Sequence, residues 1–272
     1  MAEPGKWSDL TRRVVSAVIL IAIGAALAVS SGIALWSGVA LFMALTFWEL
    51  ARMTGWKGRP HVQTPFGRSR PIALALIAGF SLFAALGMPQ FAIPVLLIPI
   101  AAGLPGAVPK DRVTYAIFGL AIMAVGYELV HLRQEYGLPF ILWLMGVVFL
   151  SDILGYFAGR MIGGPKFWPA VSPKKTWSGT VAGWIGAFFF GVLLWLTGAA
   201  EAPVILLSPI VAFAGQLGDI AESWLKRRAG VKDSSNLIPG HGGFMDRFDA
   251  VSGAVLAVML LSWLLRLPQV GL

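Results

Sequence analysis

Long apolar stretches recur along the whole of this 272-residue chain and leave little room for a charged surface. A helix that crosses a bilayer needs about 20 mainly apolar residues. Only 12% of the residues are charged, against about 25% in a soluble domain. The sequence therefore predicts an all-α, polytopic transmembrane helical bundle of about nine spans. The candidate spans centre on residues 14–30, 33–53, 71–87, 91–103, 115–132, 140–161, 179–198, 204–225 and 250–267.

Basic residues indicate how such a bundle is oriented, because Lys and Arg collect in cytoplasmic loops. When the predicted spans alternate, only Arg133 and Arg266 of the 21 Lys and Arg residues fall on the opposite side. We therefore expect a cytoplasmic N-terminus and basic cytoplasmic loops. Topology and contact with anionic lipid headgroups also account for the net charge of +8, so no nucleic-acid partner is expected.

Polar residues suited to chemistry are concentrated in the second half of the chain. Up to about residue 135 the spans hold few acids, namely Glu49 and Glu128 near helix ends. We interpret residues 1–135 as a transmembrane scaffold and residues 136–272 as a catalytic transmembrane domain with cytoplasmic loops. The chain has no cysteine, which excludes disulfides and thiolate metal sites.

Asp152 lies inside the sixth predicted span, and Tyr156 and Gly159 follow on the same helix face. A charge at membrane depth costs at least ~2.5–3.5 kcal/mol, so it usually faces a cavity or an ionic partner. A structural pair with a nearby Lys or Arg remains an alternative. The loop after this span leads into a helix start, where anions are favoured, and an ordinary basic loop is the alternative there. Its polar residues include Ser172, Lys174, Lys175 and Thr176.

A polar stripe marks the end of the eighth predicted span. Its members are Asp219, Glu222, Ser223 and Lys226, which share one helix face. Two carboxylates on that face suggest a divalent cation such as Mg²⁺, which binds a few carboxylates together with substrate phosphates. A structural network of acids and lysine is the alternative.

A glycine-rich segment joins this span to the last one. Gly240, Gly242 and Gly243 permit close approach of the backbone to phosphate oxygens. Asp246 and Asp249 are three residues apart where a helix restarts, so they can face one site. The pattern suits Mg²⁺-assisted phosphate chemistry and not acyl transfer, because no Ser–His–acid set is indicated. The same segment contains Lys232, His241 and Arg247, and His241 could equally be a structural donor.

These residues together resemble the signature of the phosphatidate cytidylyltransferase family, the CDP-diacylglycerol synthases. The resemblance rests on Ser223-Trp224-Leu225-Lys226-Arg227, Lys232-Asp233, Pro239-Gly240-His241-Gly242-Gly243, Asp246-Arg247 and Asp249. Asp152 with Tyr156, Gly159-Arg160, Gly218-Asp219 and the 172–176 segment are similar as well. Two positions depart from the family pattern: Gly155 stands where many members have Ala, and Ser178 where many have Glu.

The resemblance implies transfer of the cytidylyl group from CTP to phosphatidate at a bacterial inner membrane, at a site that faces the cytoplasm. The products would be CDP-diacylglycerol and pyrophosphate, for phospholipid biosynthesis. The expected catalytic residues are Asp219, Lys226, Asp246 and Asp249. Mg²⁺ is the expected cofactor, a second cation stays open, and the expected ligands are Asp219, Glu222, Asp246 and Asp249. The expected substrate-binding residues are Asp152, Tyr156, Ser172, Lys174, Lys175, Thr176, Ser223, Arg227, Lys232, His241, Gly242, Gly243 and Arg247. A homodimer is left open.

Two other functions remain as alternatives. A CTP-dependent polyprenol or phytol kinase would use the same nucleotide and cation, but it would transfer the γ-phosphate and release CDP. An anion transporter would fit acids at membrane depth and broken helices. The chain shows no internal repeat of the kind that transporters have, and its polar residues gather on one side.

Overall fold

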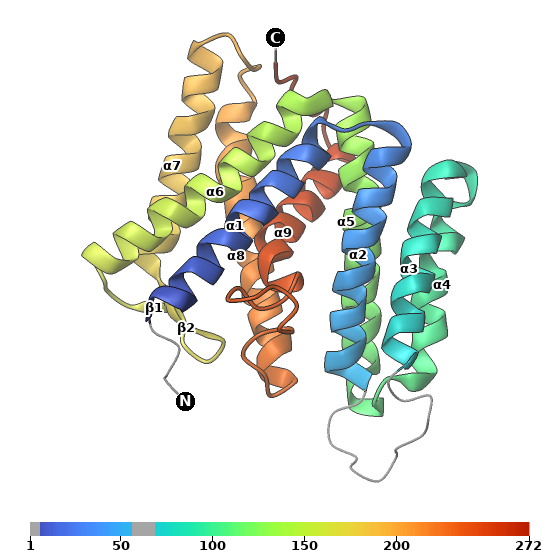
Figure 1. Cartoon of the computed structure of the whole chain (residues 1–272). Helices are drawn as coiled ribbons and strands as arrows, with labels where there is room; N and C mark the ends of the chain where they lie inside the picture. The colour runs from blue at the N-terminus through green and yellow to red at the C-terminus, as the bar shows by residue number, and fades with distance from the viewer. Residues whose placement is uncertain (1–5, 56–68, 272) are drawn as a thin grey trace. The chain divides into compact units, whose positions relative to one another are not determined.

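The computed structural model describes residues 6–55 and 69–271, and most of this part is helical (Figure 1). The α-helices are α1 (Lys6–Val29), α2 (Gly32–Gly55), α3 (Ser69–Gly87), α4 (Ala92–Gly103), α5 (Arg112–Glu135), α6 (Gly137–Met161), α7 (Trp177–Leu196), α8 (Val204–Arg228) and α9 (Met245–Ser262). Three short 3-10 helices are η1 (Pro89–Phe91), η2 (Leu104–Gly106) and η3 (Pro109–Asp111). The basic residues Lys57, Arg59 and Arg68, which we assigned to a cytoplasmic loop, lie outside the described residues.

Seven of the described helical stretches are long and apolar enough to cross a bilayer, which confirms the polytopic all-α class. They are Gly32–Gly55, Arg70–Gly87, Pro89–Gly106, Pro109–Glu135, Gly137–Met161, Trp177–Leu196 and Val204–Arg228. The first helix holds a shorter apolar stretch, Arg13–Val29, and α9 begins with Asp246, Arg247 and Asp249. The count of nine spans and the position of the N-terminus therefore stay predictions.

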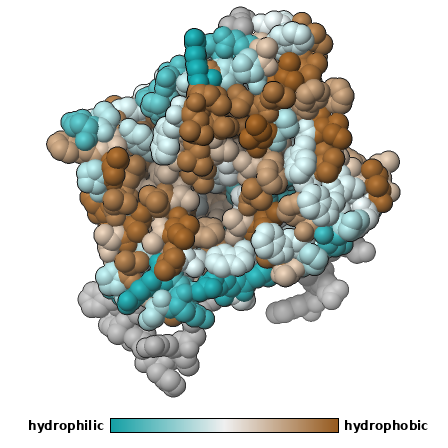
Figure 2. All heavy atoms as spheres, turned by 180° about the vertical axis from the view of Figure 1, so that it is seen from behind, coloured by the Kyte–Doolittle hydropathy of each residue, from teal (hydrophilic) through white to brown (hydrophobic). Residues whose placement is uncertain are grey.

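Large apolar side chains on the outside of the protein fit a lipid environment. Phe80, Ile93, Val113 and Leu264 are each more than two thirds exposed, and hydrophobic residues cover much of the face drawn in Figure 2. A soluble monomer rarely exposes apolar patches of large extent. In a membrane the same side chains contact acyl chains, so their exposure needs no partner protein.

The chain divides into two compact units. The first comprises Met1–Tyr127 and Arg228–Arg247, and the second Glu128–Arg227 and Phe248–Leu272. This division differs from the boundary at residue 135 because the segment Arg228–Arg247 belongs with the N-terminal helices. The functional assignment of 1–135 as scaffold and 136–272 as catalytic stays a prediction.

In the first unit, α2 packs against α3, and α3 packs against α4. Phe47, Leu50 and Leu82 are fully buried between them. The Phe47 ring also meets the ring of Tyr115 edge to face, at a centroid distance of 5.8 Å. This apolar contact holds the end of α2 that carries Glu49.

In the second unit, α6 and α7 lie side by side (Figure 1) and approach closely at glycines. A methyl group at Gly155 would lie 3.2 Å from the Gly179 carbonyl oxygen, and one at Gly159 would lie 2.8 Å from Thr176 Oγ1. Small residues permit such backbone approach between membrane helices. This close packing explains why glycine suits position 155, which is one of the two positions that depart from the family pattern.

A two-stranded antiparallel hairpin precedes α7, where the sequence predicted a loop. Its strands are β1 (Lys166–Trp168) and β2 (Ser172–Thr176), and Lys166 pairs with Thr176. Strands this short contain no alternating pattern long enough to be recognised. The hairpin fixes the backbone of all four polar residues that were assigned to substrate binding in this loop.

Candidate active site

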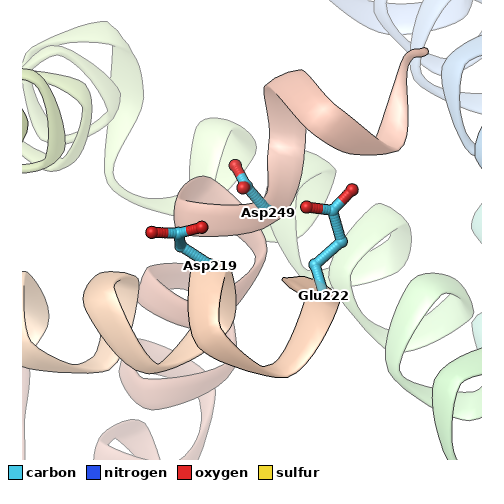
Figure 3. Close-up of side chains that lie close together, drawn as sticks. All are labelled: Asp219, Glu222 and Asp249. Atoms are coloured by element: carbon cyan, nitrogen blue, oxygen red, sulfur yellow. The ribbon is translucent and has the colours of Figure 1, made fainter. Parts of the chain in front are cut away.

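Three carboxylates meet where α8 passes α9 (Figure 3). Asp219 and Glu222 come from α8 and Asp249 from α9, and one oxygen of each lies within 4.8 Å of the others. Glu222 is buried, and the other two acids are partly exposed. Carboxylate oxygens at this spacing form the ligand set that Mg²⁺ or another hard cation prefers.

Glycines bring these acids together. A methyl group at Gly218 would overlap the carbonyl oxygen of Asp249 and crowd Gly253, and one at Gly253 would overlap the carbonyl oxygen of Ala214. The backbones of α8 and α9 are therefore close enough that side chains larger than hydrogen do not fit between them. Because Gly218 directly precedes Asp219, the close contact carries Asp219 toward Asp249.

Two lysines balance part of the negative charge. Lys175 Nζ, from the end of β2, lies 2.7 Å from Asp219 Oδ2 and also donates to the backbone carbonyl of Gln216 at 3.2 Å. Lys226 Nζ lies 2.8 Å from Glu222 Oε2, one turn further along α8. The Lys226–Glu222 pair is largely shielded from solvent, whereas Asp219 leaves the Lys175 pair partly exposed, so water screens the Coulomb attraction less in the former pair.

A cavity of about 490 Å³ adjoins the acid group, and Asp219 belongs to both. A volume of this order accommodates a small-molecule ligand. Six of the residues predicted to bind substrate line its wall, namely Asp152, Tyr156, Ser172, Lys174, Lys175 and Thr176. The structure thus brings the sixth span, the hairpin and the eighth span around one space. The ligand roles of these residues stay predictions.

The floor of this cavity is a buried hydrogen-bond network that the sequence did not reveal. Gln216 Nε2 donates to Ser151 Oγ at 3.0 Å and to the Thr180 carbonyl at 3.2 Å. Trp184 Nε1 donates to Gln216 Oε1 at 2.9 Å. Gln216 lies one turn before Asp219, so a polar stripe extended by one turn would have found it. The network fixes α6, α7 and α8 relative to one another below the cavity.

The start of α7 also faces the cavity. Thr176 caps this helix, because its Oγ1 accepts from Gly179 N at 3.2 Å. Ser178 contacts Thr176 Oγ1 at 3.1 Å and donates to the Gly163 carbonyl at 2.5 Å. Ser178 thus joins the start of α7 to the segment that precedes the hairpin. This is a structural role, and it does not require Ser178 to bind a ligand.

Two further polar residues, Arg160 and Ser223, lie beside the cavity and the acid group. Arg160 Nη1 donates to Tyr156 Oη at 2.8 Å on the cavity wall. Ser223 Oγ lies 3.5 Å from Asp219 Oδ1. Arg227 is exposed at the end of α8.

Asp246 belongs to the first unit, and its carboxylate organises the glycine-rich segment. Its Oδ2 accepts from Ser234 N at 2.9 Å and from Gly243 N at 2.8 Å, and Ser234 Oγ lies 2.9 Å away. Asp246 is not a member of the group that Asp219, Glu222 and Asp249 form. Its predicted role as a ligand of the same cation stays a prediction.

The glycine-rich segment itself is a tight turn. Ile238 N donates to the Gly242 carbonyl at 2.8 Å, and Gly240 and Gly242 have φ values of +77° and +83°, which favour glycine. The His241 ring Nδ1 lies 2.7 Å from Ser16 Oγ of α1. Arg247 donates to the His241 carbonyl through Nη2 at 2.7 Å. Lys232 is exposed at the start of the segment.

Glu49 of α2 is the acid that the sequence reasoning missed. It was interpreted as part of the scaffold, yet its carboxylate accepts hydrogen bonds from residues on both sides of the glycine turn. Its partners follow it by almost 200 residues. No local spacing in the sequence signals a contact of that range.

Comparison with known proteins shows which family this chain resembles over most of its length. The sequence model of the cytidylyltransferase family matches residues 11–265. A phosphatidate cytidylyltransferase of Brucella abortus biovar 1 (strain 9-941) is 38% identical over 156 residues, which are 57% of this chain and 58% of that protein.

Relatives from other bacteria are similar over a comparable part. The phosphatidate cytidylyltransferase of Bacillus subtilis (strain 168) is 42% identical over 120 residues, or 43% of this chain and 45% of that protein. The one from Staphylococcus saprophyticus subsp. saprophyticus is 36% identical over 146 residues, or 50% and 54%. The matches therefore span less than two thirds of these relatives' own length.

Proposed function

The chain belongs to the cytidylyltransferase family, and from this membership we propose that it transfers the cytidylyl group of CTP to phosphatidate. The products are CDP-diacylglycerol and pyrophosphate. The observation that carries the proposal is that Asp219 belongs to the acid group and also lines the cavity, together with Lys174 and Lys175. A site of this kind offers cation ligands beside cationic donors for phosphates, which is what a nucleotidyl transfer needs.

The reaction is a displacement at phosphorus. A phosphate oxygen of phosphatidate forms a bond to the α-phosphorus of CTP, and the bond from that phosphorus to the β-phosphate oxygen breaks. The bonding electrons leave with pyrophosphate. Because the nucleophile is already an anion, no strong base is required, and catalysis consists of positioning and of neutralising charge. The polar side chains around the cavity supply both.

The residues of the acid group fit Mg²⁺ by their chemistry. Asp219, Glu222 and Asp249 offer hard oxygen ligands and no sulfur or imidazole competes among them. We propose that these three acids hold the cation. When bound, Mg²⁺ would neutralise charge on the phosphates of the nucleotide.

The cationic residues that line the cavity act directly on the substrates. Lys174 and Arg160 line the cavity, where they can donate to phosphate oxygens. Lys175 is paired with Asp219 at 2.7 Å, so a phosphate that enters the cavity meets an already oriented ammonium group. Lys226 forms a corresponding ion pair with Glu222 and so holds that carboxylate in place in the acid group.

We further propose that the protein lies in the bacterial inner membrane with this site on the cytoplasmic side. The relatives are bacterial, and the distribution of Lys and Arg favours this orientation. CTP is then available from the cytoplasm, while the acyl chains of phosphatidate stay in the bilayer.

The test is release of pyrophosphate from CTP by the purified full-length protein. Release should require phosphatidate, and after chelation it should require added Mg²⁺. Asp219→Asn should lower kcat by about 100-fold or more, as when a group that stabilises developing charge is lost. Glu135→Gln, which removes an exposed acid at the end of α5, should retain activity.

Each rival function predicts a different result in this experiment. Release of CDP in place of pyrophosphate would identify a lipid kinase. Uptake of an anion into vesicles with no chemical change would identify a transporter. Full activity of Asp219→Asn would overturn the assignment of the acid group even if the reaction itself is the proposed one.

A further inference from the structure

Glu49 is a fully buried carboxylate near the end of a membrane-spanning helix, with 0% of its surface exposed. Burial of an ionised group is costly unless hydrogen bonds replace the lost water. Here four donors do so, and all four come from residues 234–245. An acid that only supported the helix bundle would not need to gather its partners from a single polar loop.

The four hydrogen bonds are distributed evenly over the two carboxylate oxygens. Oε1 accepts from Ser235 Oγ at 2.5 Å and from Phe244 N at 2.9 Å. Oε2 accepts from Ser234 Oγ at 3.1 Å and from Met245 N at 2.7 Å. Each oxygen thus joins a serine that precedes the glycine turn to a backbone amide that follows it.

This arrangement leads directly to Asp246. Ser234 Oγ lies near both Glu49 Oε2 and Asp246 Oδ2, at 3.1 and 2.9 Å. A methyl group at Gly243 would overlap Ser234 Oγ and Glu49 Oε1, so the loop is packed onto the carboxylate without spare space. A change in the position of Glu49 would therefore displace Ser234, and with it the carboxylate of Asp246.

We propose that Glu49 is a positioning residue that holds the 234–246 loop in the shape required for nucleotide binding and transfer. The proposal rests on the proposed function, because that loop supplies the predicted substrate-binding residues His241, Gly242 and Gly243. Glu49 does not itself touch substrate. It acts through the backbone amides of Phe244 and Met245 and through the two serines.

The distribution of donors makes Glu49→Gln a sharp test. Glutamine has the same shape, but one of its two terminal atoms is an amide nitrogen, which cannot accept a hydrogen bond. A serine hydroxyl can turn to accept from that nitrogen. The backbone amide beside it cannot, so either Phe244 N or Met245 N loses its partner inside the protein.

The experiment compares Glu49→Gln with Glu128→Gln in the full-length protein, below the unfolding temperature of every variant. Glu128 is a buried acid of α5 that is not among the residues that line the cavity. Hydrogen exchange of peptides that cover 234–247 and steady-state kinetics for CTP are measured together. In Glu49→Gln exchange should rise and kcat/KM for CTP should fall by about tenfold or more, while Glu128→Gln should change neither.

The outcomes separate this proposal from the proposed function. If the unsubstituted protein does not convert CTP and phosphatidate, the proposed function fails. If it does, and Glu49→Gln has faster exchange but unchanged kinetics, Glu49 is a structural residue only and the positioning role is wrong. Should Glu49→Gln fail to fold, the same two measurements on Ser235→Ala, which removes one donor to Oε1, decide the question in the same way.

Discussion

Asp219 belongs both to the acid group and to the lining of the cavity, and Lys175 is its ionic partner there. Lys175→Met keeps most of the side-chain volume but removes the ammonium group. We expect kcat/KM for CTP to fall by about tenfold or more, because Asp219 loses its counter-ion and phosphate loses a charged donor. Steady-state kinetics at saturating phosphatidate would measure the effect.

A matched variant on the same hairpin separates this ion pair from the general charge of the loop. Lys166→Met removes an exposed lysine of β1 that does not line the cavity. Surface substitutions away from such features change energies by about 0.5 kcal/mol or less, so activity should stay within about twofold. Equal losses in the two variants would show that only the summed positive charge matters, and the specific role of Lys175 would be wrong.

At the scale of elements, the contact of α8 with α9 decides whether the three acids meet. Gly253→Ala would place a methyl group against the carbonyl of Ala214 and the backbone of Gly218. Overpacking of this kind costs roughly 1–3 kcal/mol, so thermal unfolding in detergent should shift downward and activity should fall with it. Gly24→Ala in α1 meets open space and should be neutral, or stabilising by roughly 0.5–1 kcal/mol. A variant Gly253→Ala as stable and active as the parent would contradict the close helix contact.

The same scale shows what the sequence can and cannot predict. Apolar length alone predicted the helices well, as in 140–161 against α6 (Gly137–Met161) and 204–225 against α8 (Val204–Arg228). Helical spacing also placed Asp219 and Glu222 on one face, which the structure confirms. The hairpin was missed because its strands are too short for a recognisable alternation.

Glu49 was missed for a different reason. Its hydrogen bonds join α2 to residues 234–245, and a single sequence contains no local signal for a pairing over that distance. The contact between Gly218 and Gly253 could not be predicted either. Glycine is common in membrane helices, and the sequence does not indicate which glycine of another helix it contacts. Periodicity in the sequence predicts which residues share one face of a helix. Which helices contact each other depends on packing over the whole chain.

At the scale of the whole molecule, the proposed function depends on how the protein is oriented in the membrane. The proposed reaction requires that the cavity lined by Lys174 and Lys175 opens on the side of the membrane where CTP is present. The hairpin directly precedes the candidate membrane span α7 (Trp177–Leu196), and Thr197 follows its other end. Labelling one position at each end of that helix therefore determines on which side the cavity opens.

The chain is suited to this measurement because it contains no cysteine, so each introduced thiol is labelled without background. Lys166→Cys in β1 and Thr197→Cys after α7 both replace exposed residues. In intact bacterial cells, a maleimide that cannot cross the inner membrane should label Thr197→Cys. It should label Lys166→Cys only after permeabilisation, because the basic hairpin is expected in the cytoplasm. The reverse pattern would place the cavity on the side without CTP, which would contradict both the orientation and the reaction proposed for it.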